Sequence, residues 1–150
     1  MSVARRAAVV VLGMHRSGTS ALTRVLNRLG VDIGNRLLPP FAGNESGFWE
    51  HRDIIETHES LLAELGSSWD DVRPLPEDWW NFAAIAPHRQ KLIDIIDRDF
   101  RDSPLWGFQG SQDLPPSAAV ETDSGRNEEL AVLRYHGQKP GGNRELPGQA

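Results

Sequence analysis

The chain contains no cysteine, so it forms no disulfide bond and offers no thiolate to a metal or redox centre. This absence is compatible with a reducing cytoplasm, where we expect the protein to act. No apolar stretch approaches the ~20 residues that a membrane-spanning helix needs. Arginines precede an apolar run at 7–12, but this run is shorter than the hydrophobic region of a signal peptide and no small-residue cleavage site follows it. We therefore expect a buried strand there.

An excess of positive charge is also missing. The 150 residues carry a formal net charge of −5, whereas a general nucleic-acid-binding protein would present a basic face. We therefore expect no nucleic-acid partner, and any anion-binding site must be local. The length fits one domain with a substantial core, and nothing in the sequence specifies an oligomeric state.

The most informative segment is 13–20, which reads G-M-H-R-S-G-T-S. It follows the apolar run at 7–12 and precedes a helical pattern at 21–29. A buried strand, a glycine-bounded loop and a helix N-terminus in this order form a phosphate cradle, because the loop amides and the positive end of the helix dipole converge on one point. The glycines let the backbone turn tightly and approach the phosphate closely.

The spacing of this segment is that of the P-loop, with one change. Nucleoside triphosphatases have lysine after the second glycine, where it reaches the β- and γ-phosphates, but here Thr19 occupies that position and Ser20 follows. Without the lysine, ATP-dependent phosphoryl transfer loses its main cationic clamp. The loop still suits a phosphate ester, to which Arg16 can supply positive charge.

Residues 13–20 resemble the 5′-phosphosulfate-binding loop of sulfotransferases that use 3′-phosphoadenosine 5′-phosphosulfate (PAPS). The resemblance continues to about Phe108, through L-L-P-P at 37–40, G-F-W-E-H-R-D-I at 47–54 and G-S-S-W-D-D at 66–71. These segments look like a bacterial sulfotransferase family whose N-terminal part carries G-M-H-R-S-G-T-S and G-F-W-E-H. The resemblance implies an enzyme that transfers a sulfuryl group from PAPS to a hydroxyl or amine and needs no metal.

The resemblance also implies the site residues of the loop. The loop amides, together with Arg16, Thr19 and Ser20, would anchor the 5′-phosphosulfate and stabilise the leaving oxygen, although serine and threonine at a helix start can also be simple caps. His15 would either touch the sulfuryl group or only shape the turn. The predicted donor-binding set is Gly13, His15, Arg16, Ser17, Gly18, Thr19 and Ser20.

The catalytic base is predicted in the segment G-F-W-E-H at 47–51. The resemblance places a carboxylate at Glu50, and the two aromatic residues before it could desolvate this group and raise its pKa towards a useful range. Glu50 could instead be a helix-start carboxylate or an ion-pair partner of Arg52. His51 is the alternative base, because the pKa of an imidazole is intrinsically suitable.

Apolar periodicity predicts how the rest of the chain is organised. Strand–helix alternation indicates an α/β fold, specifically an incomplete P-loop-like three-layer arrangement in which helices flank a parallel sheet and the loop lies at its carboxyl edge. We expect one helix to follow the loop, a second to start at Asp53 as its N-cap with His58 as a packed core histidine, a third to start near Pro87, and a strand at 105–108. The first helix is expected to bury Leu22, Val25, Leu26 and Leu29.

The sequence changes character after Phe108. We expect 1–108 to be the N-terminal part of a sulfotransferase domain and 109–150 to be an irregular tail, since glycine, proline, serine and charge dominate there apart from a short apolar run at 130–133. Family members instead continue W-G-F with K-D-P-R, and later carry a 3′-phosphate motif like V-R-N-P followed by S-L-A-K-R.

Both missing motifs can be recovered by one shift of reading frame. With suitable synonymous codons, residues 109–122 back-translate so that removing one base gives K-D-P-R-T-C-R-R-L-P-L-W-K. The same frame applied to 136–150 permits M-V-R-N-P-E-V-I-A-S-S-L-A-K-R. We therefore hypothesise a single-base insertion near Phe108 that leaves a truncated sulfotransferase with a foreign tail.

Two alternative functions stay open beside the sulfotransferase. A P-loop small-molecule kinase would use Mg-ATP, but Thr19 in place of lysine and the lack of a clear downstream carboxylate motif count against it. A non-catalytic fragment that at most binds phosphate follows from the tail, because recognition of the 3′-phosphate would be missing. The acceptor class is likewise open between a small metabolite, a carbohydrate and a lipid.

Overall fold

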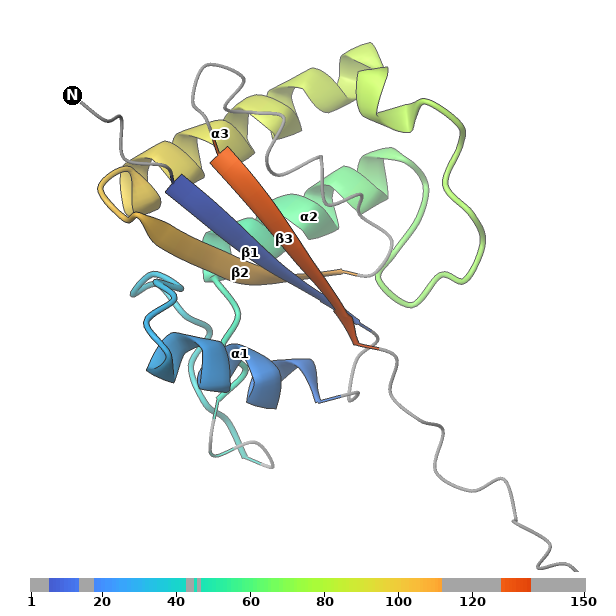
Figure 1. The fold of residues 1–150 in the computed structure, drawn as a ribbon. Coiled ribbons are helices and arrows are strands. Elements are labelled where there is room, and N and C mark those ends of the chain that lie inside the picture. The colour runs from blue at the N-terminus through green and yellow to red at the C-terminus, as the bar shows by residue number, and fades with distance from the viewer. Residues whose placement is uncertain (1–5, 14–17, 43–44, 46, 112–127, 136–150) are drawn as a thin grey trace, which may run out of the picture.

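A computed structural model describes residues 6–13, 18–42, 45, 47–111 and 128–135, which form a mixed α/β fold (Figure 1). Strand β1 (Arg6–Gly13) lies at the centre of a three-stranded parallel sheet, between β2 (Leu105–Ser111) and β3 (Glu128–Tyr135). The parallel pairing confirms the expected parallel sheet. No helix within these described ranges is long and apolar enough to cross a membrane.

The core lies on one face of the sheet, under the two longer helices. Ala8, Val10 and Leu12 alternate along β1, as the period of a strand requires, and pack with apolar residues of α2 (Arg52–Glu64), α3 (Ala86–Phe100) and β2. The indole of Trp106 on β2 stacks on the ring of Phe100 with centroids 5.0 Å apart. Helix α1 (Thr19–Arg28) contacts β1 and β2 but contributes no residue to this cluster.

The far edge of β2 is covered by the chain that follows α1. The N–H of Asp32 donates to the carbonyl oxygen of Leu105 at 3.0 Å, and the N–H of Gly107 donates back to the carbonyl oxygen of Asp32 at 2.9 Å. Val31 and Ile33, on either side of this bridge, are buried. The segment that follows α1 is thus partly fixed by strand-like pairing.

Helix α1 does not bury the residues that its apolar pattern predicts. Val25 and Leu29 are 51% and 74% exposed, whereas the buried residues of the helix are Thr19 and Thr23. The prediction is wrong because the helix presents its threonines to the end of β2, where the hydroxyl of Thr23 contacts the Gln109 side chain. This orientation makes the buried side of α1 polar.

The N-cap of helix α2 lies two residues earlier than the sequence suggests. Its N-cap is His51 rather than Asp53, and the ring nitrogen Nδ1 of His51 accepts the N–H of Ile54 at 3.4 Å. Asp53 is instead drawn into ion pairs with Arg98 and Arg36. The prediction that His58 packs in the core is confirmed, and Ile54, Leu61 and Leu62 of the same helix are buried as well.

The prediction for the third helix is confirmed, whereas the prediction for the segment after Phe108 needs correction. Helix α3 has proline in its first turn, as predicted from Pro87, and buries Leu92, Ile96 and Phe100. The expectation of an irregular segment from 109 onward is wrong in two places, since β2 extends through Ser111 and Glu128–Tyr135 forms β3. The apolar run at 130–133 lies inside that strand, because pairing with β1 satisfies its backbone. Residues 112–127 and 136–150 lie outside the described part of the chain.

Gly107 is predicted to be the least replaceable glycine of β2. A Cβ at this position would lie 2.2 Å from the carbonyl oxygen of Val9 on the neighbouring strand, so Gly107→Ala must displace backbone. We expect the free energy of unfolding to fall by about 3 kcal/mol or more. The matched control is Gly110→Ala on the same strand, where the nearest atom is a side-chain carbon of Leu12 at 3.1 Å. Equal urea midpoints for the two variants would contradict this prediction.

Candidate functional site

The predicted donor loop lies at the carboxyl end of β1. Gly13 ends the strand, and Gly18 precedes α1 with a φ of 98°, a left-handed conformation that favours glycine. Thr19 and Ser20 then form the first turn of the helix, whose leading N–H groups have no partner within the helix. Gly13 and Thr19 line one pocket, and Gly18 and Ser20 adjoin Thr19 in the chain, whereas His15, Arg16 and Ser17 fall outside the described residues.

A pocket of about 140 Å³ opens beside this turn. Parallel α/β sheets commonly bind ligands at the carboxyl ends of their strands, and this pocket lies at the ends of β1 and β2. Its wall combines the ends of β1 and β2, the start of α1, the segment before α2, and one face of α2. The lining residues are Gly13, Thr19, Leu38, Glu50, Ile55, His58, Glu59, Leu62, Trp69, Gln109 and Gly110.

Glu50 is the buried carboxyl group of this pocket. Glu50 is only 8% exposed. Its burial, and to a lesser degree the nearby charge of Glu59, raise the pKa of Glu50 to about 7. The backbone fixes its position, because the carbonyl oxygen of Glu50 accepts the N–H of Leu38 at 2.9 Å. The preceding residue, Trp49, has a left-handed φ of 57°, which is uncommon for a large side chain. This combination of strain and a shifted pKa is typical of functional sites.

Gln109 joins the carboxyl group to the helix start. Its amide Nε2 donates to Oε1 of Glu50 and to Oγ1 of Thr19, both at 2.8 Å. Its amide oxygen accepts the hydroxyl of Thr23 at 3.4 Å and that of Ser20 at 3.5 Å. Sequence reasoning missed Gln109, which it assigned to the irregular tail. The residue after W-G-F is nevertheless central to the site.

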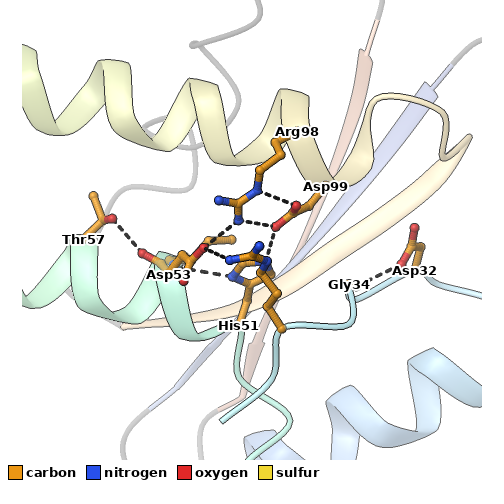
Figure 2. A network of polar contacts seen from close by, with 9 residues as sticks. Asp32, Gly34, His51, Asp53, Thr57, Arg98 and Asp99 are labelled. Carbon is orange, nitrogen blue, oxygen red and sulfur yellow. Dashed lines mark hydrogen bonds and ion pairs between the residues drawn. The ribbon is translucent and has the colours of Figure 1, made fainter.

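His51, the alternative base, does not line the pocket. Figure 2 shows its ring between α2 and α3, where Nε2 lies 2.8 Å from Oδ2 of Asp99. Arg98 bridges Asp99 and Asp53, and its guanidinium lowers the pKa of both carboxyl groups, that of Asp99 to about 2. With Nδ1 capping α2, both ring nitrogens are occupied. This geometry gives His51 a structural role at the junction of the two helices.

His58 was predicted as a packed core histidine, and the structure adds a second property. Its ring is buried and packs against the ring of Phe108, with centroids 6.1 Å apart, yet it also lines the pocket. Its Nδ1 is sealed from solvent without a hydrogen-bond partner, and burial lowers the pKa of His58 to about 4. The signal that could have revealed it is helical spacing, because Ile55, His58, Glu59 and Leu62 share one face of α2.

His58 should make folding stability depend on pH. Between pH 4 and 6.5 the unfolded chain binds a proton at His58 that the folded chain does not bind, so the free energy of unfolding increases as pH rises through this window. The gain is on the order of 3 kcal/mol. Glu50, with its raised pKa, acts in the opposite direction between pH 4.5 and 7. Urea unfolding of the wild type and His58→Gln at pH 4 and 7 isolates the histidine, and identical pH dependence in both would refute this assignment.

Within the described part of the chain, no group of three or more histidine, aspartate or glutamate side chains could hold a metal ion.

Comparison with known proteins found no relative, since no family model, curated protein or solved structure matches the chain. The sulfotransferase resemblance therefore stays a prediction carried by its motifs.

Proposed function

We propose that this chain is the N-terminal part of a PAPS-dependent sulfotransferase, built on a P-loop-like core, in which Glu50 acts as the base. The observation that carries the proposal is one juxtaposition: the end of β1, the first turn of α1 and a buried carboxyl group of pKa about 7 line the same pocket. Sulfuryl transfer requires a site that anchors the phosphosulfate and a base that accepts the proton of the acceptor.

The donor side of this proposal rests on the start of α1. The amides of the first turn, which have no partner within the helix, and the helix dipole favour a phosphate group there, and the left-handed Gly18 allows close approach of the backbone. The first turn of α1 carries no acidic residue that would repel an anion. The hydroxyl groups of Thr19 and Ser20 can donate to the phosphate once they turn from the Gln109 side chain.

The base side rests on Glu50. At neutral pH a carboxyl group with a pKa near 7 is partly ionised, so it can both accept a proton and retain it. In the proposed reaction the acceptor oxygen forms a bond to sulfur while its proton passes to Glu50. The bond from sulfur to the phosphate oxygen breaks, and adenosine 3′,5′-bisphosphate leaves with that electron pair.

A second candidate, a phosphate-binding fragment without turnover, is favoured by one observation at Gln109. The sulfotransferase resemblance expects the lysine of K-D-P-R at this position, and the neutral amide of Gln109 lies there instead, 2.8 Å from both Glu50 and Thr19. Without a positive charge at this point, stabilisation of the leaving phosphate falls to the helix amides and to the loop.

The test is transfer of radiolabelled sulfate from PAPS to a panel of alcohols and amines, run beside transfer of labelled phosphate from Mg-ATP. The proposal predicts a labelled sulfate ester and no phosphate ester. Binding of the donor product without any labelled ester would favour the phosphate-binding fragment. A phosphate ester from ATP would overturn the proposal in favour of a kinase.

A further inference from the structure

The pocket beside Glu50 has a size and an apolar wall that limit its occupant. Its volume of about 140 Å³ resembles that of an engineered apolar cavity of ~150 Å³ that holds benzene. Leu38, Ile55, Leu62 and Trp69 line it. These side chains suit a compact hydrocarbon body rather than a hydrated sugar, which would lose its hydrogen bonds to water there.

The two carboxyl groups of the pocket disfavour an acceptor that is itself an anion. Glu50 and Glu59 both line it, and they lie close enough for the charge of Glu59 to raise the pKa of Glu50. An acceptor that brought a further negative charge would be repelled by Glu59 and would keep Glu50 protonated. Neutral and cationic acceptors remain.

The side chain of His58 determines whether a neutral or a cationic acceptor fits the pocket better. The low pKa keeps its imidazole neutral at pH 7, so the ring carries one proton. A buried N–H without a partner costs more than a buried lone pair on a ring nitrogen, and Nδ1 is the sealed, unpartnered nitrogen. The proton is therefore favoured on Nε2, and because His58 lines the pocket we infer that this N–H is available to an occupant.

We propose that the pocket takes a neutral alcohol on a compact apolar body, whose hydroxyl group donates to Glu50 and accepts a hydrogen bond from Nε2 of His58. A hydroxyl group satisfies both partners at once, because it is donor and acceptor. An alkylammonium group has no acceptor and leaves the N–H of His58 unpaired. This inference rests on the proposed function for calling the occupant an acceptor, but the binding it describes needs neither donor nor turnover.

The test uses four probes of nearly the same shape: benzyl alcohol, benzylammonium, benzoate and toluene. Their affinities are measured by ligand-detected NMR on the whole chain at pH 7, without PAPS. We expect benzyl alcohol to bind about fivefold or more tightly than toluene, as one satisfied hydrogen bond allows, and more tightly than benzylammonium. Benzoate should bind weakest. Equal or tighter binding of benzoate would overturn the inference.

Two variants of His58 form the matched pair. In His58→Gln the side-chain amide reaches the place of Nε2 and can still donate, so the preference for benzyl alcohol over toluene should persist. In His58→Leu that preference should fall to about one. An unchanged preference in His58→Leu would contradict the role of the ring, whatever its effect on stability. Adenosine 3′,5′-bisphosphate is titrated separately: if it fails to bind while the alcohol preference holds, the proposed function fails and the pocket assignment stands.

Discussion

Replacing Glu50 by glutamine is expected to lower the rate of sulfuryl transfer by about 100- to 10,000-fold, the range that a positioned general base contributes. The amide keeps the shape of the carboxyl group and can still contact Gln109, so binding of adenosine 3′,5′-bisphosphate should change little. Because the carboxyl group has a raised pKa and folding favours its neutral form, Glu50→Gln should not destabilise the protein at pH 7.

The matched control for Glu50→Gln is Glu59→Gln in the same pocket. Removing the charge of Glu59 should lower the pKa of Glu50, because that charge is one of the two causes that raise it. Turnover should then persist, and the acid limb of the pH–rate profile should move to lower pH. An equal loss of turnover in both variants would show that Glu50 has no special role. The assay is run in the wild type and in the Gln109→Lys background described next.

Gln109→Lys is expected to raise the affinity for adenosine 3′,5′-bisphosphate by about 10- to 100-fold, the gain typical of a hydrogen bond to a charged group. The ammonium group would take the place of an amide that already reaches Thr19 and Glu50. Its charge should also favour the carboxylate form of Glu50 and lower the pKa of that group below 7. Calorimetric titration measures the affinity, and NMR titration of the glutamate side chain measures the pKa.

The control for Gln109→Lys is Gln109→Met, which has a similar length and no charge. It should leave the affinity unchanged or weaken it, because the hydroxyl of Thr19 loses the hydrogen bond from Gln109, whereas that of Thr23 keeps the carbonyl oxygen of Thr19. If the lysine variant gained nothing over the methionine variant, position 109 would not face the donor phosphate. That result would also remove the functional meaning of the missing K-D-P-R motif.

Local patterns in the sequence were sufficient for the strands and helices of the core. The apolar run at 7–12 lies in β1, and proline at the start of α3 marks that helix correctly. These signals suffice because burial on one face imposes a period that the residues themselves display. Strand β3 was missed because its partner, β1, lies more than a hundred residues earlier, and pairing over that separation leaves no local signature.

Side chains from distant elements explain the two errors about helices α1 and α2. Asp53 fits an N-cap by type, but Arg98 on α3 pairs with it, and His51 caps the helix instead. The apolar residues of α1 repeat at helical spacing, yet Thr19 and Thr23 face Gln109 and are buried. In both cases a side chain from a distant element decided the outcome, and no window of sequence around the helix contains that information.

The residues of the candidate site also fall into two groups: those that belong to local sequence motifs, and those that only the fold brings to the pocket. The loop glycines and Glu50 belong to contiguous motifs, so the resemblance could assign them. His58, Glu59 and Gln109 reach the pocket only because α2 and β2 converge on the end of β1. Burial in the folded chain also changes the chemistry of two pocket residues, because it lowers the pKa of His58 and raises the pKa of Glu50.

The most direct test of the account is an NMR titration of the isotopically labelled chain with adenosine 3′,5′-bisphosphate, with Mg-ATP as the comparison ligand. The account predicts that the amide resonances of Gly18, Thr19 and Ser20 shift most, that Glu50 responds, and that Mg-ATP produces smaller shifts at equal concentration. Shifts centred elsewhere, or a clear preference for Mg-ATP at the same amides, would contradict the claim that the turn from β1 into α1 binds a phosphosulfate donor.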